Sequence, residues 1–386
     1  MEGRRILTFL RPDVLADAYY EDNTLTELSL IPRGKESLLG NIYVGRVKNI
    51  AKNIRAAFVE VEGGMICYLP LEDVQEPVWA CMKKGEQLAE GDLLLVQVSR
   101  EAVKSKAPSV TTNLNLSGKY LVLTTGNRRM GYSSRFSAEE KERLKALTGQ
   151  WAEDDAGWIV RTNAAKACSE ELEMEHRRLL SQYEYLRTRA VHRLACSCVW
   201  KSRPPYLDTI LGSRENILQE ILTDDTDLYA QIRQFMEDEM PEDLEKLRLY
   251  EDRMLPLKAM YRLEKGLEEA LKEKVWLKSG AYLVIEPTEA LTVIDVNTGK
   301  FTGGKQKEDT IRKINREAAL EIARQLRLRN LSGIILVDFI DMALPEDRQE
   351  LLEEMRRLLR RDPQKAAAVG LNPLGLMEVT RKKKRK

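Results

Sequence analysis

Three oxygen-bearing side chains close two apolar segments in the last third of the chain. Asp295 and Asn297 lie two residues apart at the end of segment 291–297, and Asp338 lies near the end of segment 333–340. Residues two apart on a strand project from the same face. A carboxylate in an apolar strand is costly to bury unless a positive group pairs with it. Two interpretations therefore stay open: a cation site, or aspartates that cap turns or pair with arginine and lysine.

Two carboxylates and an amide oxygen would form a hard, oxygen-only set of ligands. Such a set suits Mg²⁺ or Mn²⁺, which keep several water molecules and bind phosphate groups through them. A cation held there could lower the pKa of a bound water, align that water with a phosphorus atom and offset the charge of the transition state. The cation interpretation thus predicts phosphodiester hydrolysis, with Asp341 as a further candidate helper.

The elements around these residues must bring them together. Segments 282–286 and 291–297 read as strands joined by a turn at 287–289, and apolar residues recur at helical spacing over 308–328. Segment 333–340 reads as a fully buried strand, and Pro345 opens a further helix. Strand, helix and strand in this order predict a parallel pair joined by a right-handed crossover. Such a pair would place both aspartates at the carboxyl ends of neighbouring strands, where open α/β sheets bind ligands.

The rest of the chain divides by composition. Short alternating strands with glycine turns between 38 and 120 predict a small barrel. The other expectations are two short apolar runs in 1–37, a strand at 157–162, a helix from about 169 to 199, and a charged helical region over 214–274 that breaks near Pro241 and Pro256.

Composition excludes several classes of protein. The 386 residues carry 62 lysines and arginines against 61 aspartates and glutamates, so a nucleic-acid site must be a local patch. The chain has two histidines and five cysteines, which favours carboxylate chemistry and reduced thiols over a histidine metal cage or a disulfide framework. No run of about 18 apolar residues and no secretory signal occurs, so we expect a soluble, cytoplasmic protein without a membrane segment.

Three other motifs need weighing. Cys196 and Cys198 form a C-x-C pair without a partner pair, so no zinc site is expected. Segment 299–306 nearly matches the phosphate-binding loop G-x-x-x-x-G-K-[ST], but Gln306 replaces the hydroxyl that ligates magnesium. The basic tail 381–386 is either a solvated end or a phosphate contact.

At several strings the sequence resembles the ribonuclease E/G family. The most specific stretch is Glu289–Gly299, which contains Asp295 and Asn297. The resemblance covers nearly the whole chain, through Glu317–Ala319, Glu321–Arg329 and Gly333–Met342 downstream, and Gly40–Tyr43, Ala56–Val59 and Tyr68–Leu71 upstream.

The resemblance implies a multidomain α+β and α/β fold. In this family an RNase H-like fold is interrupted by an S1-type OB barrel and a 5′-sensor region, and a DNase I-like catalytic subdomain follows. The implied parts are residues 1–37 and 208–274 for the two RNase H-like pieces, 38–120 for the barrel, 121–207 for the sensor region, and 275–386 for the catalytic subdomain with its basic tail.

The resemblance also implies an activity and its residues. It implies that the protein is a magnesium-dependent, single-strand-specific endoribonuclease of RNA processing and decay, which leaves 5′-phosphate and 3′-hydroxyl ends. Asp295 and Asp338 match its metal-binding aspartates, and Asn297 matches the residue that orients the attacking water or the scissile phosphate. Arg161 and Thr162 match the pocket for a 5′-monophosphate, a role that a bidentate guanidinium and a hydroxyl can fill.

The implied RNA contacts lie in the barrel. Phe58 and Tyr68 match its aromatic platform, although the pattern alone also allows core packing, and Lys106 is a candidate contact to the RNA backbone. The similarity to the family ends at Thr380. Longer members continue with a C-x-x-C zinc link and a dimerisation domain, so the oligomeric state stays open. The rival hypothesis is a non-catalytic S1-type RNA-binding protein.

Overall fold

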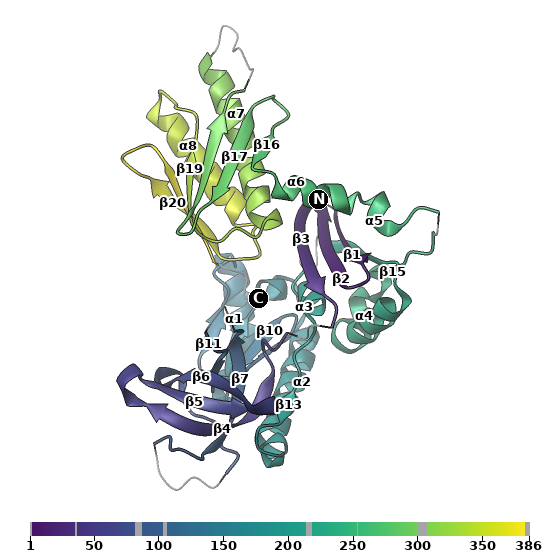
Figure 1. The fold of residues 1–386 in the computed structure, drawn as a ribbon, viewed down its shortest axis with the longest axis vertical. Helices are drawn as coiled ribbons and strands as arrows, with labels where there is room; N and C mark the ends of the chain where they lie inside the picture. Colours follow the sequence, from purple (N-terminus) through teal and green to yellow (C-terminus); the bar gives the residue numbers. More distant parts are fainter. Residues whose placement is uncertain are drawn as a thin grey trace. The chain divides into compact units, whose positions relative to one another are not determined.

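The structure is a computed structural model that describes residues 2–34, 37–81, 87–102, 106–213, 218–252, 254–299 and 307–382. The chain folds into two compact units that interleave along the sequence (Figure 1). The first contains Met1–Gly34, Asn216–Gln231 and Glu245–Arg385, and the second contains Lys35–Glu215 and Ile232–Leu244. Among the described residues, no helix is long and apolar enough to cross a membrane.

The first unit contains a five-stranded sheet in the order β15-β14-β1-β2-β3. Strands β1, β2 and β3 form an antiparallel meander, and β14 and β15 run parallel to β1. The strands are β1 (Gly3–Arg11), β2 (Val14–Glu21), β3 (Thr24–Pro32), β14 (Leu218–Thr223) and β15 (Leu247–Leu249), and the unit also contains the helices α5 (Leu257–Met260) and α6 (Leu263–Leu271). Helix α4 (Thr226–Glu239) begins in the first unit and continues into the second, and most of η7 (Pro241–Lys246) belongs to the second.

Two expectations were wrong in this sheet. Residues 1–37 hold three strands and not two short apolar runs, and the charged region 214–274 is not helical throughout. Leu218–Thr223 becomes a strand because it pairs on both sides, with β1 and with β15. The pairing with β1, which lies more than 200 residues earlier in the sequence, outweighs the local preference of a charged sequence.

The first unit also contains a six-stranded sheet in the order β16-β17-β18-β19-β21-β20. The predicted strands and crossover helix are present, and β18 and β19 are parallel neighbours. The expectation that segment 333–340 is fully buried was wrong, because only one face of β19 meets the core and Ile334 on the other face is 53% exposed. Pro345 occupies the first turn of its helix, as predicted. The elements are β16 (Lys274–Trp276), β17 (Tyr282–Pro287), β18 (Thr292–Asn297), α7 (Lys307–Leu328), β19 (Gly333–Asp338), α8 (Pro345–Leu359), β20 (Ala366–Leu371) and β21 (Met377–Arg381).

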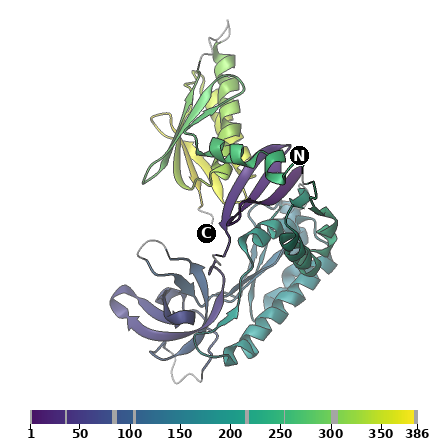
Figure 2. The same cartoon turned by 45° about the vertical axis from the view of Figure 1, so that its right-hand side comes forward.

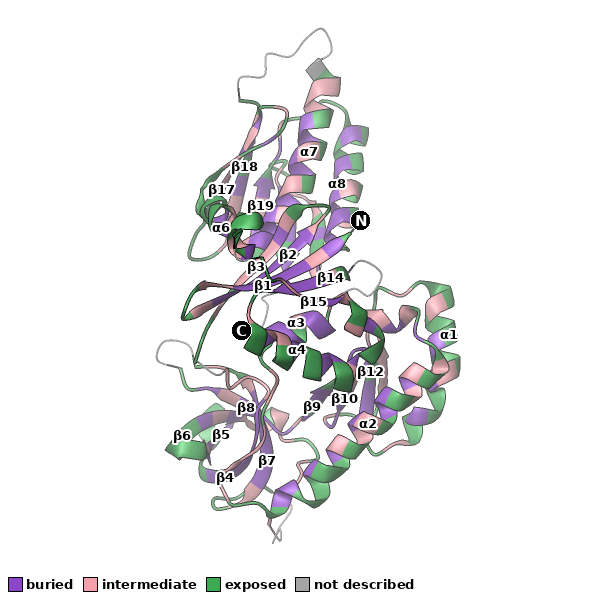
Figure 3. Cartoon of the chain, turned by 90° about the vertical axis from the view of Figure 1, so that its right-hand side faces the viewer, coloured by how far each residue is buried: buried purple, intermediate pink, exposed green. Residues whose placement is uncertain are grey.

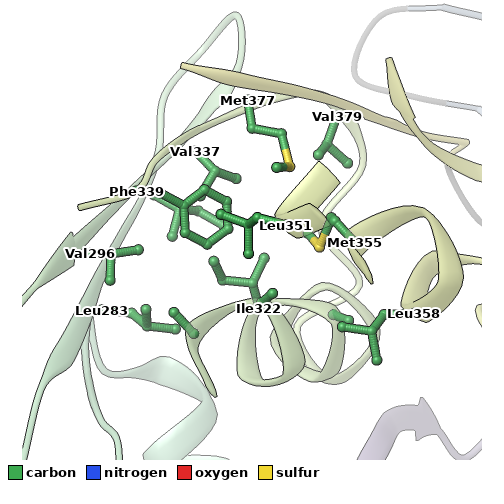
Figure 4. Packing of buried hydrophobic residues seen from close by; sticks show 14 of the residues in the cluster. Leu283, Val296, Ile322, Val337, Phe339, Leu351, Met355, Leu358, Met377 and Val379 are labelled. Carbon is green, nitrogen blue, oxygen red and sulfur yellow. The ribbon is translucent and has the colours of Figure 1, made fainter. Parts of the chain in front are cut away.

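One face of the six-stranded sheet packs against α7 and α8. Alternate strand residues such as Leu283, Val296 and Val337 point to this face and meet Ile322 and Leu351 of the two helices (Figure 4). The helices alternate buried and exposed residues, as expected for elements with one apolar side (Figure 3). The intervening strand residues point to the opposite face, where many side chains are exposed or half-buried.

The second unit contains the predicted barrel. Its strands follow the order β4-β5-β6-β8-β7, and a pairing between β4 and β7 closes it. An added strand, β13, pairs with β4. The barrel elements are β4 (Ile42–Ala51), η1 (Lys52–Ile54), β5 (Ala56–Val61), η2 (Glu62–Gly64), β6 (Met65–Pro70), η3 (Leu71–Asp73), β7 (Leu93–Arg100), β8 (Ser109–Thr111) and β13 (Cys198–Trp200).

A four-stranded sheet in the order β11-β12-β10-β9 shares a core with the barrel. The long helix α2 packs on this sheet through residues such as Leu179 and Leu186 (Figure 2). The elements are β9 (Asn115–Ser117), β10 (Leu121–Thr124), β11 (Met130–Tyr132), α1 (Ala138–Thr148), η4 (Gly149–Glu153), β12 (Gly157–Val160), η5 (Thr162–Ala165), α2 (Ser169–Thr188), η6 (Ala190–His192) and α3 (Pro205–Leu211).

The predicted helix over 169–199 was too long. It ends at Thr188, and Cys198–Trp200 leaves the helical path to pair with β4. Cys196 adopts a positive φ of 63°, which a helix cannot accommodate. The turn is set by pairing with a distant strand, so the local sequence pattern does not reveal it.

Candidate active site

Asp295 and Asp338 lie directly opposite each other on neighbouring parallel strands. Residue 295 of β18 is in register with residue 338 of β19, and both side chains are exposed. Neighbouring strands lie about 5 Å apart, so two residues in register project side by side from one face. The fold therefore brings the two predicted aspartates together at the carboxyl ends of their strands, on the face that α7 and α8 leave open.

Asn297 is joined to the same pair. Its Nδ2 donates a hydrogen bond of 2.6 Å to Oδ2 of Asp295. The bond fixes the orientation of the half-buried amide and turns its Oδ1 away from the carboxylate. Of the two roles considered for this residue, ligand or orienting group, the hydrogen bond favours the orienting one.

Negative charge accumulates at the carboxylate pair. Partial burial, then Asp295 and Asp341, raise the pKa of Asp338 above its usual value. Each neighbouring carboxylate disfavours a second negative charge. A divalent cation would relieve this repulsion, and two carboxylates are a sufficient protein contribution for an ion that keeps most of its waters. No cluster of three or more histidine, cysteine or acidic ligands occurs in the described ranges, so water would complete the coordination.

Arg161 and Thr162 lie where β12 ends and η5 begins. The Arg161 guanidinium donates to the carbonyl of Gly118, and the Thr162 hydroxyl lies 2.9 Å from the Ser133 hydroxyl. Burial lowers the pKa of Arg161, and Glu175 and Asp208 oppose that shift. Both residues are half-buried and held in place by these hydrogen bonds, so they do not form a freely exposed strand end.

Phe58 and Tyr68 face each other across β5 and β6 of the barrel. Their ring centroids are 6.3 Å apart in an edge-to-face arrangement, and both side chains are half-buried. Their strand neighbours Ala57 and Cys67 point into the barrel core instead. Lys106 is exposed and lies two residues before Pro108, whose carbonyl accepts the amide of Tyr68. Phe58 and Tyr68 therefore share the outer face of the barrel, and the segment that carries Lys106 leads into the residues that pair with β6.

Other sequence expectations fare differently. Arg381 is not part of a solvated tail, because it is buried in β21 and pairs with Asp362 at 2.7 Å. Residues 300–306 of the phosphate-loop motif and 383–386 of the tail lie outside the described residues. The five cysteines are free thiols, as predicted.

A sequence model of the ribonuclease E/G family matches residues 115–384. Ribonuclease G of Salmonella typhimurium is 34% identical over 98% of this chain and 80% of its own length. Ribonuclease G of Haemophilus influenzae is 34% identical over the whole of this chain and 80% of its own. Ribonuclease E of a Nostoc species is 34% identical over 95% of this chain and 54% of its own. The chain belongs to the ribonuclease E/G family.

This membership makes the protein an endoribonuclease of the ribonuclease E/G type and not the non-catalytic RNA-binding protein of the rival hypothesis. The resemblance read from Glu289–Gly299 and its companion strings is confirmed. The roles of Asp295, Asp338 and the other site residues stay predictions, which the geometry above makes specific.

Sequence reasoning missed the residue that positions the end of β19 in this ribonuclease E/G protein. Asn315 of α7 is fully buried, and its amide forms two hydrogen bonds to the backbone of Ile340, one of 2.8 Å from Nδ2 to the carbonyl and one of 3.1 Å from the peptide nitrogen to Oδ1. The bonds fix the backbone two residues after Asp338. The signal was present, because Asn315 interrupts the apolar stripe formed by Ile311, Ile314 and Ala318.

We expect Asn315→Leu to destabilise the protein and to slow RNA cleavage. The change leaves two backbone groups of Ile340 unpaired, which costs about 1–3 kcal/mol of unfolding free energy for each buried group. Denaturant melts and single-turnover cleavage measure the two effects. Leu320→Ala changes an exposed residue of the same helix and is the control, which should lose neither stability nor activity. A normal cleavage rate in Asn315→Leu, or an equal loss in Leu320→Ala, would show that the hydrogen bonds do not position the loop.

A close approach of two glycines sets the turn after β18. Gly299 has a φ of +65°, and a Cβ on it would lie 2.3 Å from the carbonyl oxygen of Gly280. Any side chain at 299 would therefore displace the backbone that follows Asn297. On the same side, Glu317 of α7 accepts the amides of Lys278 and Ser279. Glu317, which lies in one of the segments similar to the family, thus holds the β16–β17 connection against α7.

Proposed function

We propose that the protein hydrolyses single-stranded RNA with Mg²⁺, or with Mn²⁺ in its place, and leaves 5′-phosphate and 3′-hydroxyl ends. The observation that carries the proposal is the register of Asp295 opposite Asp338. These carboxylates would hold the cation, which when bound supplies a water of lowered pKa and offsets negative charge on the reacting phosphate.

The chain's own residues would do the rest of the work. Asp295 accepts a hydrogen bond from Nδ2 of Asn297, which leaves the Oδ1 of that amide to accept a hydrogen bond from the attacking water and so to orient it. Asn315 keeps the strand end of Asp338 in place through Ile340. Asp341 increases the negative charge next to Asp338 and so favours cation binding.

The topology supports the finer description of the parts. A meander β1-β2-β3 flanked by the parallel strands β14 and β15 is the strand arrangement of an RNase H-like sheet, which fits residues 1–37 and 208–274. The closed barrel fits an S1-type domain over 38–120, and the sheet β9–β12 with α2 fits the sensor region over 121–207. The sheet β16–β21 with α7 and α8 fits a DNase I-like subdomain within 275–386.

The direct test is cleavage of a 5′-labelled oligonucleotide in single-stranded and duplex form. We expect Mg²⁺-dependent cuts in the single strand, and products that a 5′-phosphate-dependent exonuclease degrades. Protection of the products from that exonuclease, or preferential cutting of the duplex, would contradict the proposal. Because the RNA substrates of a bacterial processing and decay enzyme are found in the cytoplasm, we also propose that the enzyme works there.

Phe58 and Tyr68 would supply base stacking on the barrel, and Lys106 a contact to phosphate. We expect Phe58→Ala or Tyr68→Ala to weaken single-strand binding about tenfold each, since one stacked base contributes about 1–3 kcal/mol. Fluorescence anisotropy with a labelled oligonucleotide measures the change. Ile66→Ala, an aliphatic neighbour on the same outer face, is the matched control and should bind normally. Equal effects of all three variants would argue against stacking.

A further inference from the structure

The open face of the six-stranded sheet carries a cluster that the proposed reaction does not use. The rings of Trp276 and Tyr282 lie 5.2 Å apart at an angle of 57°. The Lys274 ammonium lies 3.5 Å from the Tyr282 ring centroid and 4.4 Å from that of Trp276. The three residues combine an aromatic surface with a positive charge, which is the composition of a site for single-stranded nucleic acid.

The strand register places this cluster beside the carboxylate pair. Trp276 is opposite Tyr282, which is opposite Asn297. In the next row, Lys274 is opposite Val284, which is opposite Asp295. Residues opposite each other share a face, so the cluster and the aspartates face the same side. With about 5 Å between strands, Tyr282 is one strand away from Asn297 and Trp276 is two strands away.

Core packing does not account for Trp276. Its side chain is 61% exposed, whereas its strand neighbours Val275 and Leu277 contact the apolar core below the sheet. A large aromatic residue at the exposed edge of a sheet gives up most of the burial that normally stabilises it. Its place above an ammonium and next to a tyrosine instead leaves a flat apolar surface accessible to a ligand.

We infer that Lys274, Trp276 and Tyr282 form a nucleotide subsite next to the cleavage site. A base of the single-stranded substrate stacks on Trp276, and Lys274 offsets the charge of the adjoining phosphate. The inference rests on the proposed function for the identity of the ligand. RNA is the occupant because its chain must leave the carboxylate pair along this face, where Asp295, Asp338 and Asp341 repel phosphate and Lys274 attracts it.

The test measures RNA affinity in a background that should not cleave, Asp338→Asn, so that binding is read without turnover. We expect Trp276→Ala to weaken binding of a single-stranded oligonucleotide about tenfold, and Trp276→Phe to restore most of it, because any aromatic face can stack. Lys274→Ala should reduce affinity and its dependence on salt. Leu374→Ala is the control, since Leu374 is 83% exposed near the other edge of the sheet.

An oligonucleotide series with one abasic position at a time gives the specific signature. At one position, removal of the base should weaken binding to the chain with Trp276 and leave binding to Trp276→Ala unchanged. Equal affinity of Trp276→Ala and Leu374→Ala, or a Trp276 effect that no abasic position removes, would overturn the subsite. Thermal melts of each variant show whether the sheet stays folded.

The outcomes also separate this inference from the proposed function. If Asp338→Asn cleaves RNA normally while Trp276→Ala binds weakly, the subsite stands and the cation site fails. If Asp338→Asn is inactive while Trp276→Ala binds and cleaves normally, the cation site stands and the subsite is wrong.

Discussion

Asp338→Asn should lower the rate of RNA cleavage by at least about a hundredfold, because it removes one of two charged groups that hold the ion stabilising the transition state. The affinity for single-stranded RNA should change little. The amide has the size of the carboxylate, and the stacking residues of the barrel are far along the chain from the change. Single-turnover cleavage and fluorescence anisotropy on the same preparation measure the two effects separately.

The control for this variant is Glu286→Gln, which removes an exposed carboxylate from the same face of β17, two strands away from β19. It should cleave at the normal rate. If Asp338→Asn cleaves RNA within a factor of about two of the wild-type rate, Asp338 has no role in the proposed site. The same conclusion follows if Glu286→Gln loses as much cleavage activity as Asp338→Asn.

Loss of folding does not account for the expected inactivity of Asp338→Asn. The pKa of Asp338 is raised in the folded protein, so the folded chain binds its proton more readily than the unfolded chain does. The metal-free protein therefore loses stability as pH rises from the ordinary aspartate pKa through the raised value. Removing the charge should leave the metal-free variant at least as stable as the wild type at neutral pH, which a thermal melt without metal tests.

Arg161→Ala should remove the preference for RNA with a 5′-monophosphate over RNA with a 5′-hydroxyl. The guanidinium of Arg161 donates a hydrogen bond to the carbonyl of Gly118, and the hydroxyl of the next residue, Thr162, is hydrogen-bonded to that of Ser133. A positive, already oriented group can bind phosphate without a large loss of side-chain entropy. Cleavage rates of two oligonucleotides that differ only at the 5′ end measure the preference, which should fall to about one from about tenfold or more.

The 5′-hydroxyl substrate serves as the internal reference, because its cleavage should be equal in the wild type and in Arg161→Ala. Arg177→Ala is the matched control, since Arg177 is an exposed arginine of α2 that pairs only with Glu173 among the ion pairs of the described chain. A preference that survives in Arg161→Ala, or that disappears equally in Arg177→Ala, would exclude the assigned role.

The sequence predicted the parts of the site that are set by local pattern. Six-residue apolar strands around Asp295 and Asp338, with a long amphipathic helix between them, leave few arrangements other than a parallel pair, and the structure has that pair. Phe58 and Tyr68 could not be separated from core residues by pattern alone. Their exposure depends on which face of β5 and β6 the barrel encloses, and the resemblance supplied the answer.

The features that pattern did not reveal depend on contacts between distant segments. Leu218–Thr223 is a strand because β1 and β15 flank it, and Cys198–Trp200 is a strand because β4 accepts it. The hydrogen bond from Arg161 to the carbonyl of Gly118 likewise joins residues 43 positions apart. Asn315 is the exception, because a polar residue within an apolar helical stripe is visible in the sequence and indicates a buried partner.

The central claim is that Asp295 and Asp338 hold one divalent cation between them. Titration of the metal-free protein with Mn²⁺, followed by electron paramagnetic resonance of the free ion, tests it without any cleavage. We predict one ion bound per chain at this site, with affinity reduced at least about tenfold by either Asp295→Asn or Asp338→Asn and unchanged by Glu286→Gln. Wild-type affinity and stoichiometry in both aspartate variants would contradict the claim.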